Sequence, residues 1–374
     1  MSLKKMDSDQ IPLSRLTNLN IAGYSRMTPE EVASSLGALQ AQDYQASLWA
    51  IGLRCKQGTT KIEVENALRT AKVVRTWLLR GTLHCAASID VKWITELIYP
   101  RLLRTAMLRD RHLGLSSETV EKTKSVLFEA LRGGKQLTRS EVYKLFESTN
   151  VPTKNNLGYH MLYRAAWDGL ICFGTHNRKE SSFVLLDEWI PEHRKYTGNV
   201  ALKELALRYF SSHGPATMSD YVWWSGVKTS DARTGIELAS SALSTEEVEG
   251  RIYHYVKQTR RLPSEEKQTY LLPAFDEYLL GYKDRQAVLG GSQTKETLKN
   301  SKSNFVHSNG VFLPTVVIDG HVSGVWKSKI GAKKVVITVN LFRKLEIDQK
   351  SSIKEAADSY GDFLEQPVEM KVQE

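Results

Sequence analysis

Gln40 and Gln42 are separated by a single residue in the segment 38–44, where a helical pattern of apolar residues ends. A neutral carboxamide can fix a polar group through hydrogen bonds, although it neither gives nor takes a proton near neutral pH. The alternative is structural, with Gln40 capping a neighbouring backbone group and Gln42 solvated. Glutamine pairs are common in proteins, so their spacing alone favours the structural interpretation.

The element that must position these amides is a helix predicted over residues 28–41. Thr28 and Glu31 form a capping box at its start. Apolar residues at four-residue spacing place Gln40 in line with the buried face of this helix. In a regular helix Gln42 would point about 200° away from Gln40. Both amides can therefore face one pocket only if the helix ends or distorts between them.

The composition is that of an ordinary globular protein. A chain of 374 residues is too long for one hydrophobic core, so we expect about two to four domains. Hydrophobic content is 41% and charged content 25%. Without a signal sequence or a long apolar segment, we expect a cytoplasmic protein that does not enter a membrane. Cys55, Cys85 and Cys172 lack metal-ligand spacing, so we expect reduced packing residues, no metal and no cofactor.

The net charge of +9 makes a phosphate polymer the first partner to test. Between residues 283 and 350 there are 12 Lys and Arg against 5 Asp and Glu. A predicted hairpin tip in this region carries four lysines, here called the hairpin lysines: Lys327, Lys329, Lys333 and Lys334. They would either contact phosphate or only keep an exposed sheet edge soluble. A second basic cluster is predicted between two helices, as a solvated linker or a phosphate contact, and includes Arg101 and Arg104. A third lies at a strand-turn tip and includes Arg178 and Lys179.

One pattern of elements recurs three times along the chain: helices, then a pair of short strands about a turn. The strand pairs are predicted at 73–79 with 82–86, at 170–173 with 182–186, and around 246–257. This order is typical of a winged helix. We therefore predict an α+β, mainly helical chain with three tandem winged-helix modules and a small β-rich C-terminal domain. The predicted boundaries are 1–112, 113–195, 196–262 and 263–374.

Four runs of the sequence carry a family resemblance: LLPAFDEYLLGYKDR at 271–285, VFLPTVVIDGHVSGVW at 311–326, RTWLLRGTLH at 75–84 and LQAQD at 39–43. Together they resemble the bacterial winged-helix family of AlkZ-like DNA glycosylases, enzymes that unhook interstrand crosslinks. The resemblance implies a monomeric protein with a C-shaped body, which holds double-stranded DNA that carries alkylated purines. The family's catalytic motif is Gln, an apolar residue, then Gln or Asp. Gln40-Ala41-Gln42 matches it position by position.

The implied chemistry needs no strong acid, because a purine alkylated at a ring nitrogen is already cationic and leaves without protonation. Gln40 and Gln42 would hold the attacking water near an oxocarbenium-like sugar. Asp43 and His84 are possible supporting residues, although capping is the commoner role for such an Asp and structural hydrogen bonding for such a His. The alternative function is a winged-helix DNA-binding protein or transcriptional regulator without catalysis. Release of an alkylated base from DNA would distinguish the two.

Overall fold

A small sheet near the N-terminus carries the glutamine motif. The computed structural model describes residues 7–177, 180–256, 268–289, 312–342 and 347–373. The sheet has the strand order β1-β3-β2, with β1 at Leu39–Gln40, β3 at Leu83–Ala87 and β2 at Val73–Trp77, and all neighbours are antiparallel. The helices of this first group are α1 (Gln10–Asn18), α2 (Pro29–Leu36), α3 (Tyr44–Gly52) and α4 (Lys61–Arg69). The predicted strands at 73–79 and 82–86 are confirmed.

The helix predicted over residues 28–41 begins where the sequence predicted, but it ends before the predicted C-terminal residue. Thr28 caps α2, and Glu31 completes the capping box. The helix stops at Leu36, because Gly37 follows in a positive-φ conformation (φ 78°) that glycine adopts without steric cost. The expectation that Gln40 lies on this helix was therefore wrong. Gln40 belongs to strand β1 and pairs with His84 of β3.

Residues 88–112 form one long helix, α5 (Ser88–His112), of 25 residues. The prediction that Arg101 and Arg104 lie in a linker between two helices was therefore wrong. The helix is continuous because Ile94, Ile98, Leu102 and Ala106 recur every fourth residue and are all buried. Both arginines are exposed on it.

Two further groups of helices and strands follow. The second consists of α6 (Ser117–Leu131), β4 (Leu137–Thr138), α7 (Arg139–Ser148), α8 (Leu157–Trp167), β5 (Ile171–Asn177), β6 (Glu180–Leu185) and α9 (Leu186–Trp189), with strand order β4-β6-β5. The third consists of α10 (Gly198–Ser212), α11 (Met218–Ser225), α12 (Thr229–Ala239), β7 (Ser244–Val248) and β8 (Arg251–Tyr255). Within each group, helices precede a strand pair, as the sequence predicted.

A five-stranded sheet occupies the C-terminal part of the chain. Its elements are β9 (Thr269–Leu272), α13 (Glu277–Leu280), α14 (Gln286–Leu289), β10 (Thr315–Ile318), β11 (His321–Ile330), β12 (Val335–Leu341), α16 (Ile347–Leu364) and β13 (Val368–Gln373). The strand order is β13-β12-β11-β10-β9. The sequence had not predicted β13, which pairs parallel to β12 after α16 has carried the chain back along the sheet.

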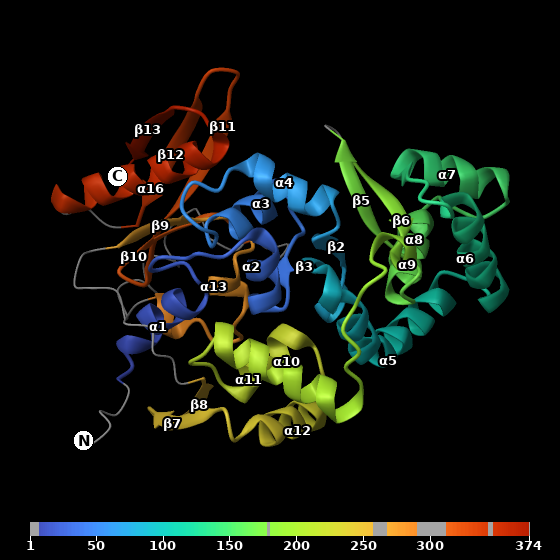
Figure 1. The fold of residues 1–374 in the computed structure, drawn as a ribbon, viewed down its shortest axis with the longest axis horizontal. Helices are drawn as coiled ribbons and strands as arrows, with labels where there is room; N and C mark the ends of the chain where they lie inside the picture. Colours follow the sequence, from blue (N-terminus) through green and yellow to red (C-terminus); the bar gives the residue numbers. More distant parts are fainter. Residues whose placement is uncertain (1–6, 178–179, 257–267, 290–311, 343–346, 374) are drawn as a thin grey trace.

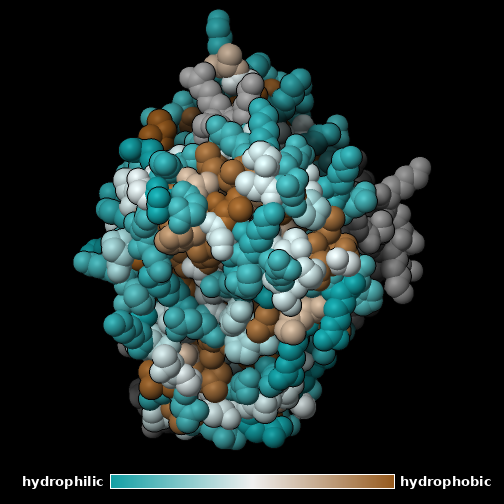
Figure 2. Space-filling view, turned by 90° about the vertical axis from the view of Figure 1, so that its right-hand side faces the viewer, coloured by the Kyte–Doolittle hydropathy of each residue, from teal (hydrophilic) through white to brown (hydrophobic). Residues whose placement is uncertain are grey.

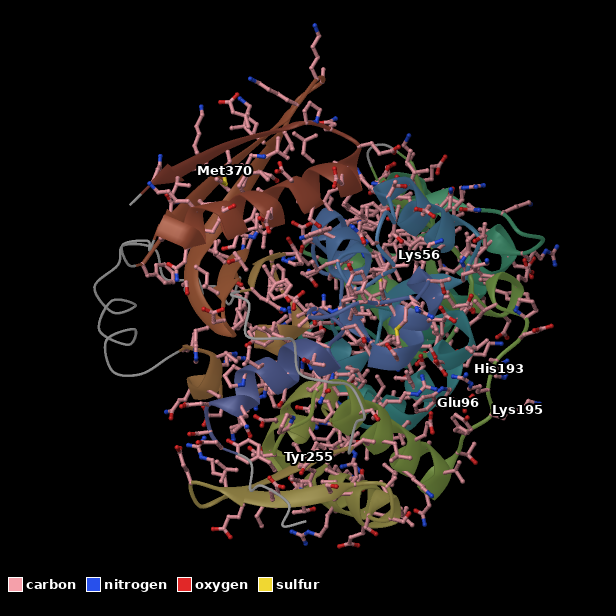
Figure 3. All side chains as sticks on the ribbon, turned by 60° about the vertical axis from the view of Figure 1, so that its left-hand side comes forward. Lys56, Glu96, His193, Lys195, Tyr255 and Met370 are labelled. Carbon is pink, nitrogen blue, oxygen red and sulfur yellow. The ribbon has the colours of Figure 1, made fainter. Side chains whose placement is uncertain are left out.

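Hydrophobic cores join these groups rather than lying inside each one. One core contains residues of the first, second and third groups, among them Trp77, Phe146 and Trp224. Another joins the first group to the C-terminal sheet, for example through Ile51 and Val317. The first group accordingly lies between the C-terminal sheet and the third group (Figures 1 and 3). In Figure 3, Lys56 lies at a height between those of Met370 of β13, above it, and Tyr255 of β8, below it.

A buried ion pair links the first group to the C-terminal part. Arg54 Nη2 lies 2.8 Å from Asp276 Oδ1, and the two side chains are 0% and 1% exposed. Removing one partner would leave a buried charge unpaired, at a cost of about 3–5 kcal/mol. This pair therefore anchors the segment that leads into α13.

The surface, the cysteines and the helices show no unusual feature among the described residues. Figure 2 shows one face of the molecule, on which apolar patches are small and separated by polar side chains. Cys55, Cys85 and Cys172 are free and buried. Within the described ranges, none of the helices combines the length and the apolarity that a membrane crossing requires.

Candidate functional site

The backbone of the glutamine motif is held in an extended conformation along β3. Leu39 and Gln40 pair with Cys85 and His84, and the Ala41 N–H donates to the Leu83 carbonyl at 2.7 Å. Because neither glutamine lies in a helix, the 200° separation that a helix would impose on Gln40 and Gln42 does not arise. The chain then enters α3, where the Asp43 carboxylate caps the helix by accepting from the Ala46 N–H at 3.0 Å.

The two glutamine side chains have different surroundings. Gln40 is 8% exposed. Its Oε1 accepts from Arg80 Nη2 and from Thr82 Oγ1, each at 3.3 Å. Gln42 is exposed, and its carboxamide makes no hydrogen bond with the described residues. One amide is therefore fixed by the protein, whereas the other is free to meet a ligand.

Sequence reasoning missed the residues that hold Gln40. Arg80 lies in the turn between β2 and β3, where it adopts a left-handed conformation (φ 56°), and Thr82 follows it. Glu277 comes from α13, and its Oε1 accepts the Gln40 backbone N–H at 2.8 Å. Both Arg80 and Glu277 occur in runs that carry the family resemblance, but nothing in their spacing indicated a contact with Gln40.

Glu277 is a buried carboxylate, 2% exposed, with three hydrogen-bonding neighbours. Besides the Gln40 N–H, it accepts from Trp224 Nε1 at 3.0 Å and faces His213 Nε2 at 3.4 Å. Burial opposes its charged form, but the bond to His213 and the charges and bonds around it together hold the pKa of Glu277 below its ordinary value. Glu277 is therefore ionised at neutral pH beneath the glutamine strand.

His84 lies beside Gln40 in the strand register and is fully buried. Its Nδ1 lies 2.8 Å from the Thr82 carbonyl oxygen, which can only accept, so Nδ1 carries the hydrogen. Burial, with a smaller contribution from the Arg80 charge, lowers the pKa of His84 to about 4. The imidazole is therefore neutral at physiological pH. Its Nε2 has no hydrogen-bond partner among the described residues.

A cavity of about 620 Å³ opens next to Arg80. Its walls come from α5, the end of α8, the region of α11, the start of α12 and the segment after α13. They include Arg101, Trp167, Trp223 and Lys283. Arg101 donates to the carbonyls of Gly226 and, at 3.0 Å, Val227. This guanidinium is thus tied to the end of α11. Gln40 and Gln42 are not among the residues that line this cavity.

A smaller hollow of about 300 Å³ separates the first group from the β5–β6 hairpin. Tyr44, two residues after Gln42, stacks on His176 with ring centroids 4.0 Å apart. Arg75 donates to the Ala41 carbonyl at 3.0 Å, and its guanidinium lies 4.7 Å from the centre of the Phe173 ring. The backbone between the two glutamines is therefore braced from the second group as well. Arg178 and Lys179, at the tip of that hairpin, lie outside the described residues.

The hairpin lysines lie on β11 and in the turn before β12. All four are exposed, and nitrogen-tipped side chains project from this hairpin into solvent (Figure 3). Lys334 forms an ion pair with Glu369 of β13 at 2.5 Å. The other three have no ion-pair partner in the part of the chain that the structure describes.

Comparison with known proteins places this geometry in a family. No curated protein matches the sequence. Among solved structures, the chain is similar to the DNA glycosylase AlkZ of Streptomyces sahachiroi, with a TM-score of 0.75 and 22% identity. The match covers 98% of this chain and 100% of that one, and at this identity it shows a shared fold. A family model described as "DNA glycosylase AlkZ-like" matches residues 33–363. The chain therefore belongs to the family of AlkZ-like DNA glycosylases.

Proposed function

We propose that the protein is a monofunctional DNA glycosylase, acting as a monomer on double-stranded DNA. It hydrolyses the N-glycosidic bond of purines that carry a cationic N7-alkyl group, interstrand crosslinks included. The observation that carries this proposal is the glutamine motif of an AlkZ-like chain, with Gln40 held by Arg80 and Thr82 and Gln42 exposed beside it.

The two amides have separate roles in this proposal. The exposed Gln42 carboxamide accepts a hydrogen bond from the attacking water and orients it towards the sugar. As the water oxygen bonds to the sugar carbon and the base leaves with the electron pair of the glycosidic bond, the proton of the water is released to solvent, because an amide is not a base. Gln40 Oε1 already faces Arg80, and the single Thr82 hydroxyl hydrogen is shared between Gln40 Oε1 and the Leu79 carbonyl, each at 3.3 Å. Whenever Thr82 donates to Leu79, one lone pair of Gln40 is available. That carbonyl dipole then stabilises the positive charge that develops on the sugar.

Around Gln40 the positive charge of Arg80 is balanced by a buried carboxylate. His84 is neutral at physiological pH, so it does not repel a positively charged purine. Glu277 adds one buried negative charge beneath the strand. Because the alkylated base departs as a neutral molecule, the reaction requires no proton from either side chain. We therefore expect the excision rate to be nearly independent of pH around neutrality.

The architecture supports a DNA-holding role in the same proposal. The recurring order of helices and a strand pair fits three tandem winged-helix modules at 1–112, 113–195 and 196–262. The C-terminal β-rich domain at 263–374 would close them into a C-shaped body around the duplex. Its hairpin lysines would contact backbone phosphates beside the lesion.

The test is release of a free base from alkylated DNA. Purified protein is incubated with double-stranded DNA carrying N7-methylguanine, and the supernatant is assayed for the free base. We expect release by the wild type and its loss in Gln42→Ala, with duplex binding retained in both. Binding without release of any alkylated base would refute the enzyme and support the DNA-binding alternative.

A further inference from the structure

The contacts that fix Gln40 meet at one residue of the third group. The Gln40 backbone N–H is held by Glu277, which also accepts from the Trp224 indole at 3.0 Å. The Gln40 side chain is held by Arg80, whose Nη1 donates to the Trp224 carbonyl and, at 3.4 Å, to the Trp223 carbonyl. Trp224 lies in α11 and is fully buried. Main chain and side chain of Gln40 are thus tied to one turn of a distant helix.

We propose that Arg80 is a positioning residue for the reaction, which orients the Gln40 carboxamide and locks it to α11 through Trp224. The proposal rests on the proposed glycosylase function. A guanidinium carries only donors, so it selects the carbonyl oxygen of Gln40 and turns the NH₂ group away. The amide therefore presents a single orientation to the reacting sugar.

The local backbone is built for this contact. Arg80 occupies the left-handed region, which costs a non-glycine residue about 1–3 kcal/mol and persists only where its surroundings enforce it. Gly226, after α11, packs so closely that an added Cβ would lie 3.1 Å from Arg80 Cγ. The Arg80 side chain is therefore confined between the turn and the end of α11.

Arginine also suits this position electrostatically. Burial lowers the pKa of the Arg80 guanidinium, and the Glu277 carboxylate opposes that change. An arginine starts from so high a pKa that it stays charged. Its charge polarises the Gln40 amide, while the Glu277 carboxylate, which accepts from the Gln40 backbone N–H, balances that charge. A lysine would keep the charge but could not bridge two carbonyls and the amide with one planar fork.

The experiment is a double-mutant cycle on the excision rate constant, measured in single turnover with saturating enzyme so that changes in DNA affinity do not enter. The proteins are the wild type, Arg80→Ala, Gln40→Ala and the double variant. We expect Arg80→Ala to slow excision by about 10- to 100-fold, the scale of misplacing a group in the reacting geometry. In the Gln40→Ala background the same change should have no further effect, because the amide that Arg80 orients is gone.

Two more variants separate positioning from general damage. Arg80→Lys keeps charge and bulk and should be nearly as slow as Arg80→Ala. Arg194→Ala is the matched control, because Arg194 is also a half-buried arginine with a hydrogen-bonded guanidinium, which donates to Asp90 Oδ1 at 2.8 Å and not to Gln40. It should excise at the wild-type rate.

Each outcome has a separate meaning. Additive losses in the cycle would overturn the inference, because Arg80 would then act by itself, for example on a DNA phosphate. An active wild type with unchanged Arg80→Ala and Arg80→Lys would overturn it too. Should Arg80→Ala fail to fold, Arg80→Lys in both backgrounds completes the same cycle. A wild type that releases no alkylated base would instead refute the proposed function itself.

Discussion

Replacing Gln42 by alanine should separate activity from stability. The side chain is exposed and makes no hydrogen bond with the described residues, so the free energy of unfolding should change by no more than about 0.5 kcal/mol. Losing one fixed polar contact to a transition state costs about 2.7–4 kcal/mol, which corresponds to about 10²- to 10³-fold in rate. Gln42→Ala should therefore fold like the wild type and excise at least about 100-fold more slowly.

Gln40→Ala should lose activity as Gln42→Ala does, but it should also be less stable than Gln42→Ala. Its Oε1 accepts from Arg80 and Thr82 in a site where Gln40 is 8% exposed. Removing that acceptor leaves a buried donor unsatisfied, at about 1–3 kcal/mol. We expect a lower urea midpoint together with an excision loss of about 100-fold or more. Strand pairing through the backbone is kept, so the variant should still fold.

The assay is the release of N7-methylguanine in single turnover, with urea unfolding followed by circular dichroism on the same preparations. Gln45→Ala is the matched control, since Gln45 is an exposed glutamine three positions further along the chain. It should match the wild type in both measurements. If Gln42→Ala and Gln40→Ala both excise at the wild-type rate, the catalytic assignment is wrong.

Three further changes test other parts of the molecule. Replacing the hairpin lysines with alanine should flatten the slope of log K against log salt for duplex binding by about 3 units, near 0.9 per lost phosphate contact, because Lys334 already pairs with Glu369; an unchanged slope in a salt titration would show that these lysines only solubilise the hairpin. Asp43→Ala should cost about 1 kcal/mol in urea unfolding by removing the cap of α3, whereas Asp43→Asn, which keeps an acceptor, should not; equal losses would contradict the capping role. The pKa of His84 is lowered to about 4 in the folded protein, so below about pH 6.5 the unfolded chain binds a proton at His84 that the folded chain does not bind. The free energy of unfolding should therefore fall by up to about 3 kcal/mol between pH 6.5 and pH 4, and by less in His84→Gln. Urea titrations at the two pH values would measure this difference.

Local signals in the sequence were enough for most helices and strand pairs. The capping boxes at Thr28, Thr138 and Thr217 are present in the structure because each depends on residues only three positions apart. The end of α2 was also a local signal, since Gly37 takes a positive φ there, but the apolar spacing that continues to Gln40 led to a longer predicted helix. Four-residue spacing likewise runs through Arg101 and Arg104, where the predicted linker is a helix.

Gln40-Ala41-Gln42 could be identified as the candidate motif from the sequence, because its three residues are contiguous. The residues that surround them became visible only in the folded chain. Gln40 meets His84 through strand pairing, and it meets Glu277 across 237 positions of the chain. The different exposure of Gln40 and Gln42 depends on those contacts too. Contacts at such separations follow from how the helix groups share their cores, and no periodicity in one stretch of sequence encodes that packing.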